Sequence, residues 1–348
     1  MKRLKRVLLR TVAFALFSLT ITAYAQDHTL LGAGSTFVYP LFSRMFAEYA
    51  KTNKVNVNYQ SIGSGGGILQ LTNKTIDFGG SDAPLNAEQA SKMAAVLHIP
   101  MASGADVVTY NIPGIHASLK MTAAILSNIY LGKILNWNDS QIQSLNKGIK
   151  LPDLAILVIH RSDGSGTTFI WTDYLSKVNS EWAKKVGKGT SVNWPIGLGG
   201  KGNEGVSGLV KQTPGAIGYV ELAYAIENKM PVAQVQNKAG KFITPNLSSI
   251  TASSNITLPA DAKVSLTNTP NPLGYPISSF TWALIYKEQK YGNRSEARAK
   301  ELLQLIWWNI HIGQKNCVPL NYAPLSSAAV KVSEKILKSA TFAGKAIL

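Results

Sequence analysis

The chain has 348 residues, with 35 Lys and Arg against 19 Asp and Glu, so its formal charge is +16. This length leaves room for two domains of roughly 150 residues each. An apolar content of 45% and a mean hydropathy of +0.04 argue against a disordered chain and against a multi-span membrane protein. The one cysteine, Cys317, excludes a disulfide framework and a multi-thiolate metal site, and we expect it to be a buried apolar residue.

The first 25 residues have the pattern of a secretory signal peptide. Five Lys and Arg and no acid stand at the start, an apolar run follows to about Thr22, and Ala23-Tyr24-Ala25 forms an A-x-A cleavage pattern. The alternative is a membrane anchor, but the apolar run is short for a span. We expect cleavage after about Ala25 and a periplasmic protein of charge +11. A basic protein invites a nucleic-acid partner, but export leads us to expect none.

Strand-like and helix-like stretches alternate along the mature chain, which predicts an α/β fold. Apolar residues at helical spacing predict helices over 36–52, 86–97, 165–177, 296–309 and 326–339. Alternating or continuous apolar runs predict strands over 55–59, 106–110, 155–160 and 280–287. The polar segment 238–269 has the composition of a surface loop.

Two of the predicted strands are candidate crossovers between domains, at 107–111 and at 280–287. A chain that crosses twice forms a discontinuous first domain with a second domain inserted in it. We therefore expect residues 26–110 plus 280–348 to form lobe I, and residues 111–279 to form lobe II.

Four clusters of small residues are candidates for ligand binding: 32–36 (GAGST), 63–67 (GSGGG), 79–82 (GGSD) and 161–167 (RSDGSGT). The first, second and fourth lie between a strand-like and a helix-like stretch. Glycine lets the backbone approach a ligand, and a helix N-terminus offers free N–H groups to an anion. The alternative is that these residues only form turns and N-caps. Arg161 ends a buried strand, and Asp163 could orient its planar fork toward an oxyanion.

Asp82 is unexpected in an anion site, because a carboxylate repels anions. It fits if the ligand carries a proton that Asp82 accepts. Phosphate keeps a proton near neutral pH and sulfate does not, so a fixed acceptor would discriminate between them. The alternative is that Asp82 only caps the turn before Ala83-Pro84.

Motifs of enzymes are missing from the sequence. There is no G-x-S-x-G elbow and no Walker A motif, and the five His are scattered without an i,i+4 pair. Gly-rich 197–205 is weak as a dinucleotide motif, and we expect a structural loop. We expect no catalytic residue, no metal and no cofactor.

Seven motifs stand together in one order: GAGSTF, GSGGG, GGSDAPL, IYLGKI, RSDGSGTTF, NWPIGLGGKGN and PGAIGYVE. In them, the chain resembles the periplasmic phosphate-binding proteins of the phosphate-specific (Pst) ABC transporter. The likeness runs from about residue 30 to 228 and resumes near 280. It implies a periplasmic-binding-protein fold of type II, with two α/β lobes, a hinge and an interdomain cleft. It also implies a monomer that closes around dehydrated phosphate and delivers it to membrane permease and ATPase subunits.

The resemblance assigns phosphate contacts to eight residues: Thr36, Phe37, Ser64, Asp82, Arg161, Ser165, Gly166 and Thr167. Asp163 would support Arg161, and Asp82 would accept the phosphate proton. The first three clusters would belong to one lobe and RSDGSGT to the other. Ser35 and His160 depart from the family pattern, but neither is a principal ligand position. Two other functions use the same site: a secreted phosphate scavenger or adhesin, and a phosphatase-like hydrolase, which would lack a metal cluster and an activated nucleophile.

Overall fold

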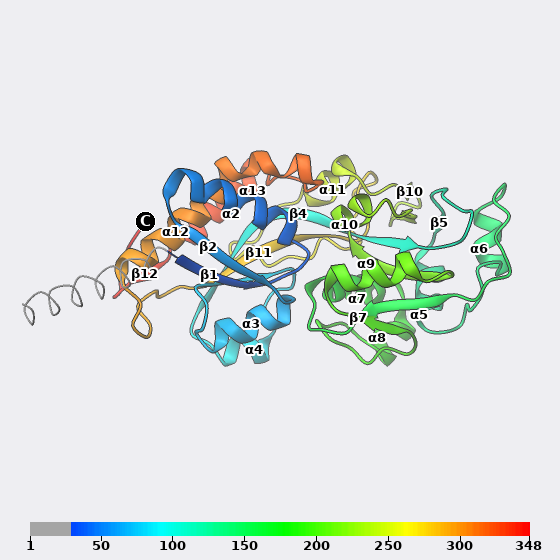
Figure 1. The fold of residues 1–348 in the computed structure, drawn as a ribbon, viewed down its shortest axis with the longest axis horizontal. Coiled ribbons are helices and arrows are strands. Elements are labelled where there is room, and N and C mark those ends of the chain that lie inside the picture. Colours follow the sequence, from blue (N-terminus) through cyan, green and yellow to red (C-terminus); the bar gives the residue numbers. More distant parts are fainter. Residues whose placement is uncertain (1–28) are drawn as a thin grey trace, which may run out of the picture.

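The computed structural model describes residues 29–348, so the predicted signal peptide lies outside the described residues. The molecule is elongated, and strands β4 and β11 run along it between two groups of helices (Figure 1). The principal helices are α2 (Tyr39–Asn53), α3 (Ser64–Thr72), α5 (Ala123–Tyr130), α7 (Gly166–Val178), α9 (Gly202–Gln212), α11 (Leu247–Ser254), α12 (Glu296–Ile310) and α13 (Ser327–Lys338). Shorter ones are α4 (Ala87–Ser91), α6 (Ser140–Leu145), α8 (Ser180–Lys185) and α10 (Leu222–Glu227).

An eight-stranded sheet runs through the molecule, and its strands lie in the order β2-β1-β3-β11-β4-β8-β6-β7. These strands are β1 (Thr29–Gly34), β2 (Asn56–Ser61), β3 (Phe78–Ser81), β4 (Val96–Tyr110), β6 (Leu157–Arg161), β7 (Leu198–Gly200), β8 (Ala216–Glu221) and β11 (Ser278–Tyr286). β1 pairs in parallel with β2 and β3, and β6 in parallel with β7 and β8. Helices interleave with these strands along the chain, so the predicted α/β class is confirmed.

Strand β4 joins the two ends of this sheet. Its first part, up to Ala105, pairs antiparallel with β11, and Asp106–Tyr110 pairs antiparallel with β8. One continuous strand thus runs from the parallel strands around β1 to those around β6. The boundaries of the two lobes, at 110/111 and 279/280, stay a prediction.

Three predicted elements were wrong in extent. Residues 197–205, expected to be a loop, contain β7 and the start of α9. The helix expected over 86–97 ends at Ser91, because Val96 and Leu97 already pair with β11. Pro100 does not end an element but lies inside β4, where the register with β11 shifts. Proline donates no backbone hydrogen bond, and such an irregularity accommodates it. The segment 238–269 is not all loop either, since it contains α11, whose Ile250 is fully buried.

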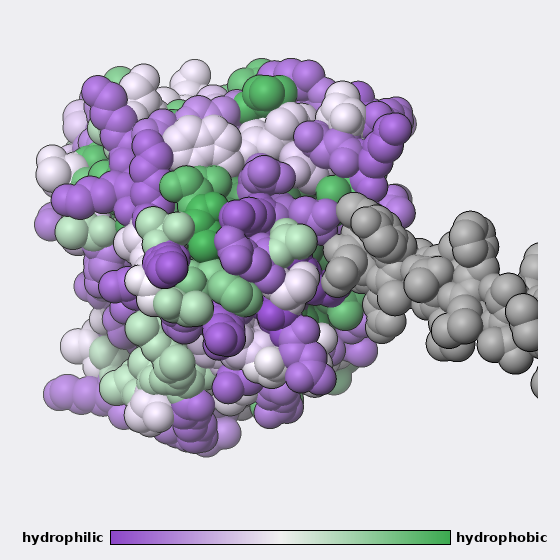
Figure 2. Space-filling model, turned by 90° about the vertical axis from the view of Figure 1, so that its left-hand side faces the viewer, coloured by the Kyte–Doolittle hydropathy of each residue, from purple (hydrophilic) through white to green (hydrophobic). Residues whose placement is uncertain are grey.

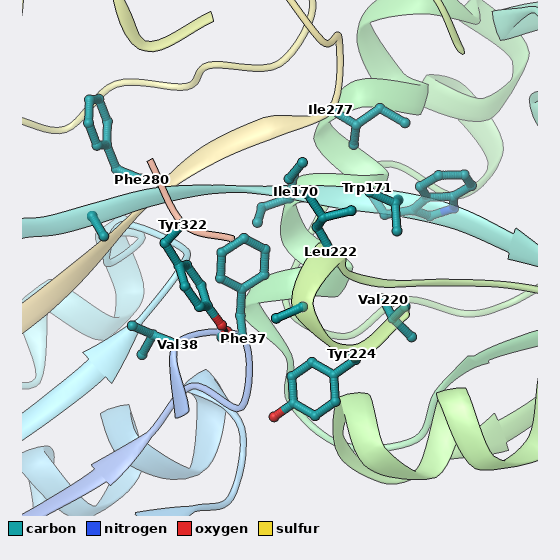
Figure 3. Packing of buried hydrophobic residues seen from close by; sticks show 14 of the residues in the cluster. Phe37, Val38, Ile170, Trp171, Val220, Leu222, Tyr224, Ile277, Phe280 and Tyr322 are labelled. Atoms are coloured by element: carbon teal, nitrogen blue, oxygen red, sulfur yellow. Dashed lines mark hydrogen bonds between the residues drawn. The ribbon is translucent and has the colours of Figure 1, made fainter. Parts of the chain in front are cut away.

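The core draws on the whole chain. Figure 3 shows Phe37 and Tyr322 side by side, with Trp171 and Leu222 from the middle of the sequence packed nearby. Cys317 is buried, as predicted, and burial raises the pKa of its thiol to about 12. Figure 2 shows one end of the molecule, where hydrophilic residues cover most of the surface and apolar areas are smaller. Among residues 29–348, no helix has the length and apolar character needed to cross a membrane.

Two acids face each other in the register of the central strands. Asp106 on β4 pairs with Glu221 on β8, and both side chains are fully buried. Neither carboxyl oxygen of Asp106, nor Oε1 of Glu221, has a hydrogen-bond partner. Burial raises the pKa of both carboxyl groups well above the ordinary values, which favours the neutral form of each.

We predict that Asp106→Asn gains stability relative to the wild type as the pH rises. An acid whose pKa is raised by folding keeps its proton in the folded state, so folding is progressively opposed above the unfolded-state pKa of about 3.9. An amide does not ionise in this pH range, so its burial adds no such pH dependence to the free energy of unfolding. Urea unfolding at about pH 4 and about pH 8 should show the difference in free energy growing with pH. The same comparison for exposed Asp261→Asn is the control; an unchanged difference for Asp106→Asn would contradict the prediction.

Candidate anion-binding site

The loop between β1 and α2 brings a row of small residues against β3. The backbone N–H of Ser35 donates to Gly80 O at 2.8 Å. Gly34 has φ +137°, and a Cβ there would lie 2.1 Å from Gly80 O, so only glycine allows this approach. Thr36 and Phe37 follow at once and are 2% and 0% exposed. The tight strand contact therefore fixes where both residues lie.

Two tyrosines hold the backbone of this loop. Tyr322 Oη donates to Phe37 O at 2.6 Å, and Tyr224 Oη donates to Thr36 O at 2.7 Å. The Phe37 ring meets the Tyr322 ring edge-on, with centroids 6.4 Å apart (Figure 3). Tyrosines from distant parts of the chain thus occupy both carbonyls, and the Thr36 hydroxyl faces α9.

Asp82 lies directly after β3 and is 1% exposed. Three hydroxyl groups donate to it: Ser35 at 2.6 and 2.7 Å, Thr281 at 2.8 Å and Ser64 at 3.3 Å. Burial raises the pKa of Asp82 to about 6, although the hydroxyls and the charge of Arg161 act to lower it. Ser35 has a single proton that both carboxylate oxygens share, so three protons serve a group that can accept about four hydrogen bonds. Asp82 therefore has the capacity to accept one further hydrogen bond from a ligand.

Arg161 ends β6 and is 3% exposed. Its fork donates to Asp163 from Nε at 2.8 Å and from Nη2 at 2.6 Å, while Nη1 donates to Thr167 Oγ1 at 3.2 Å. Burial acts to raise the pKa of Asp163, but the hydrogen bonds and charge of Arg161 prevail and hold it below the ordinary value. The pair is a bidentate charge-assisted contact, which fixes the plane of the guanidinium.

The N-terminus of α7 meets the Asp82 region. Ser165 is the N-cap, and its Oγ accepts from Thr168 N at 3.0 Å. A Cβ on Gly166 would lie 2.4 Å from Ser64 Oγ and 2.5 Å from Asp82 Oδ2, so glycine is required for this close approach. A further link lies beside it, where Gly65 N donates to Gly164 O at 2.8 Å. The two groups of parallel strands therefore touch through their strand-to-helix turns.

The residues singled out in the sequence come together in one place. The eight predicted contact residues are all buried, and they lie in three turns that follow β1, β2 and β6 and in the segment after β3. Asp163 lies behind Arg161, with its side chain 14% exposed. Whether these residues bind phosphate stays a prediction.

Sequence reasoning missed two polar side chains at this site. Thr281, on β11, donates to Asp82, and Asn203, on α9, donates to both Thr36 and Thr167. A signal for Asn203 existed, because it ends the motif NWPIGLGGKGN. No motif indicated Thr281, because it lies in a strand whose other residues are mostly apolar.

The arrangement can bind an oxyanion and also accept a proton from it. Buried N–H groups, hydroxyls and one guanidinium surround a small region, and a single carboxylate faces it. Within residues 29–348, no group of three or more His, Cys, Asp or Glu is arranged to hold a metal ion.

Comparison with known proteins agrees with this fold. The profile of the PBP superfamily domain matches residues 22–306, more than half of the chain. The phosphate-binding protein PstS of Xylella fastidiosa is 45% identical over 307 residues, covering 87% of this chain and 83% of that protein. The chain therefore belongs to the PBP superfamily and, within it, to the family of the PstS phosphate-binding proteins.

Two solved structures share the fold at 18% identity. One is a substrate-binding protein of a phosphate ABC transporter from Clostridium perfringens with bound phosphate; its TM-score is 0.63, with 86% of this chain and 100% of that chain covered. The other is a high-affinity periplasmic phosphate-binding protein with bound phosphate; its TM-score is 0.68, with 87% and 92% covered. The predicted two-lobe α/β binding-protein fold is confirmed.

We predict that Tyr322→Phe destabilises the protein by about 1–2 kcal/mol, because the buried carbonyl of Phe37 loses a hydrogen bond. Urea unfolding measures the loss. Tyr39→Phe is the matched control: Tyr39 is 37% exposed, and its change should stay within about 0.5 kcal/mol. Equal effects of the two substitutions would show that the Phe37 carbonyl does not depend on Tyr322.

Proposed function

We propose that this protein binds inorganic phosphate in the periplasm and delivers it to the permease and ATPase subunits of an ABC importer. The observation that carries the proposal is Asp82, a buried acceptor placed opposite buried donors. The names of the relatives support the same ligand, and the solved structure from C. perfringens supports the transporter. The protein acts as a monomer and catalyses no reaction, and it reaches the periplasm after cleavage near Ala25.

Phosphate takes up a position between the two groups of strands. Thr36, Phe37 and Ser64 donate from one side, Ser64 through its backbone N–H because its hydroxyl donates to Asp82. The N-terminus of α7 donates from the other side through Ser165, Gly166 and Thr167. Arg161 supplies the positive charge, and Asp163 fixes its plane. The contact between Gly65 and Gly164 supports a closed arrangement, in which residues 26–110 plus 280–348 form lobe I and 111–279 form lobe II.

Asp82 gives the site its selectivity. Its remaining acceptor position takes the proton that phosphate keeps near neutral pH. Sulfate has no proton to donate, so its oxygen would face the lone pairs of a buried carboxylate, and neither partner could satisfy the other. The positive charge of the chain as a whole attracts anions in general, whereas this acceptor chooses among them.

The direct test is calorimetry on the purified mature protein after removal of bound ligand by unfolding and refolding. We expect saturable binding of phosphate and none of sulfate at the same concentration. Absence of heat with phosphate, or turnover of a chromogenic phosphate ester by the pure protein, would refute the proposal.

We predict that Asp82→Asn weakens the preference for phosphate over sulfate by about tenfold or more, because an amide can donate to an unprotonated oxygen and removes a buried negative charge. The ratio of the two dissociation constants is the measurement. Asp163→Asn is the matched control, because it loosens Arg161 and should weaken both anions alike. If Asp82→Asn left the ratio unchanged, Asp82 would not be the selective group.

A further inference from the structure

Asn203 lies at the second position of α9, and its side chain is fully buried. The preceding Gly202 has φ +70°, so the chain turns sharply from β7 into the helix and brings the first residues of α9 against the β1–α2 loop. The exposed fraction of a helix residue this near the N-terminus is usually higher. Its burial here comes from contact with Thr36 on the opposite group of strands.

The amide of Asn203 makes contacts on both of its ends. Nδ2 donates to Thr36 Oγ1 at 2.7 Å and to Thr167 Oγ1 at 3.1 Å, and the backbone N–H donates to Thr36 Oγ1 at 3.2 Å. Oδ1 accepts from the backbone N–H of Glu221 at 2.9 Å. Because Oδ1 faces a backbone donor, the orientation of the amide is fixed, and both protons of Nδ2 point at the two threonines.

These contacts decide what the threonine hydroxyls can do. A hydroxyl oxygen has two lone pairs and one proton. Thr36 Oγ1 accepts two hydrogen bonds from Asn203, and Thr167 Oγ1 accepts one from Asn203 and one from Arg161 Nη1 at 3.2 Å. With both lone pairs of each oxygen occupied, each hydroxyl can only donate its proton. An anion needs donors.

The hydroxyls around Asp82 use their protons within the protein. Ser35, Ser64 and Thr281 donate to that carboxylate, so their hydroxyls have no proton left for a ligand. The site therefore combines one acceptor, Asp82, with two hydroxyl donors that are free for a ligand, Thr36 and Thr167.

We propose that Asn203 is a positioning residue of the phosphate site, which orients the Thr36 and Thr167 hydroxyls so that both donate to the anion. The inference rests on the proposed phosphate binding. Asn203 acts through the threonines and need not touch the ligand. It also links α9 to the β1–α2 loop of the opposite group of strands, so the Thr36 hydroxyl is oriented only when the two groups are together.

A double-mutant cycle on phosphate affinity tests the inference. Asn203→Ala should weaken phosphate binding by about tenfold or more in the wild type, but by much less in the Thr36→Val background, where one oriented hydroxyl is already gone. A general structural role would cost the same factor in both backgrounds, and that result would overturn the inference. Asn136→Ala, a change at an exposed asparagine, is the control and should leave the affinity unchanged.

A second variant keeps the inference testable if Asn203→Ala does not fold. Asn203→Asp keeps the shape of the side chain but replaces the Nδ2 donor with an acceptor, which draws the threonine protons away from the anion. It should bind phosphate more weakly than the wild type by about tenfold or more, and wild-type affinity would refute the inference. Wild-type protein that binds no phosphate would instead refute the proposed function itself, so the two failures are distinguishable.

Discussion

The site depends on one constraint: the carboxylate of Asp82 is buried and must be compensated without a cation in contact with it. Ser35, Ser64 and Thr281 provide that compensation as hydroxyl donors from three separate segments. A hydroxyl neutralises less charge than a guanidinium, so the pKa of Asp82 stays raised, at about 6. This leaves the carboxylate able to take a proton from a ligand, which a full ion pair with Arg161 would prevent. The small residues around it follow from the same constraint, because the segments must approach within backbone contact.

Charge alone cannot explain binding at this site. Arg161 is already paired with Asp163, and Asp82 adds a further negative charge, so the immediate surroundings carry no excess of positive charge. Attraction for an anion must then come from oriented dipoles, which are the N-terminus of α7 and the hydroxyls whose protons are fixed. Such dipoles need rigid backbones. The tyrosines that hold the carbonyls of Thr36 and Phe37 supply that rigidity from outside the site.

The sequence predicted the parts of the fold and site that depend on local pattern. Helical spacing located α2, α7, α12 and α13 within a few residues. The glycine-rich turns indicated the candidate anion site because glycine is needed where two backbone segments approach closely. Contacts between segments that are distant in the sequence have no such local pattern and could not be predicted. Thr281 meets Asp82 only because β11 pairs with β3, and this pairing spans about two hundred residues of chain. The helix end at Ser91 was missed because pairing with β11 overrides the helical pattern of 92–97.

The buried acids Asp106 and Glu221 also affect the charge around the candidate anion site. They lie on the strands that carry the chain from one group of parallel strands to the other, close enough to Asp82 and Arg161 for their charges to interact. Ionised, they would add two negative charges behind an anion site. Burial raises the pKa of both carboxyl groups and so favours their neutral form, which lowers the stability of the fold as the pH rises. The large positive charge of the chain can then remain at the surface as a long-range attraction, while the selectivity that we propose depends on Asp82 alone.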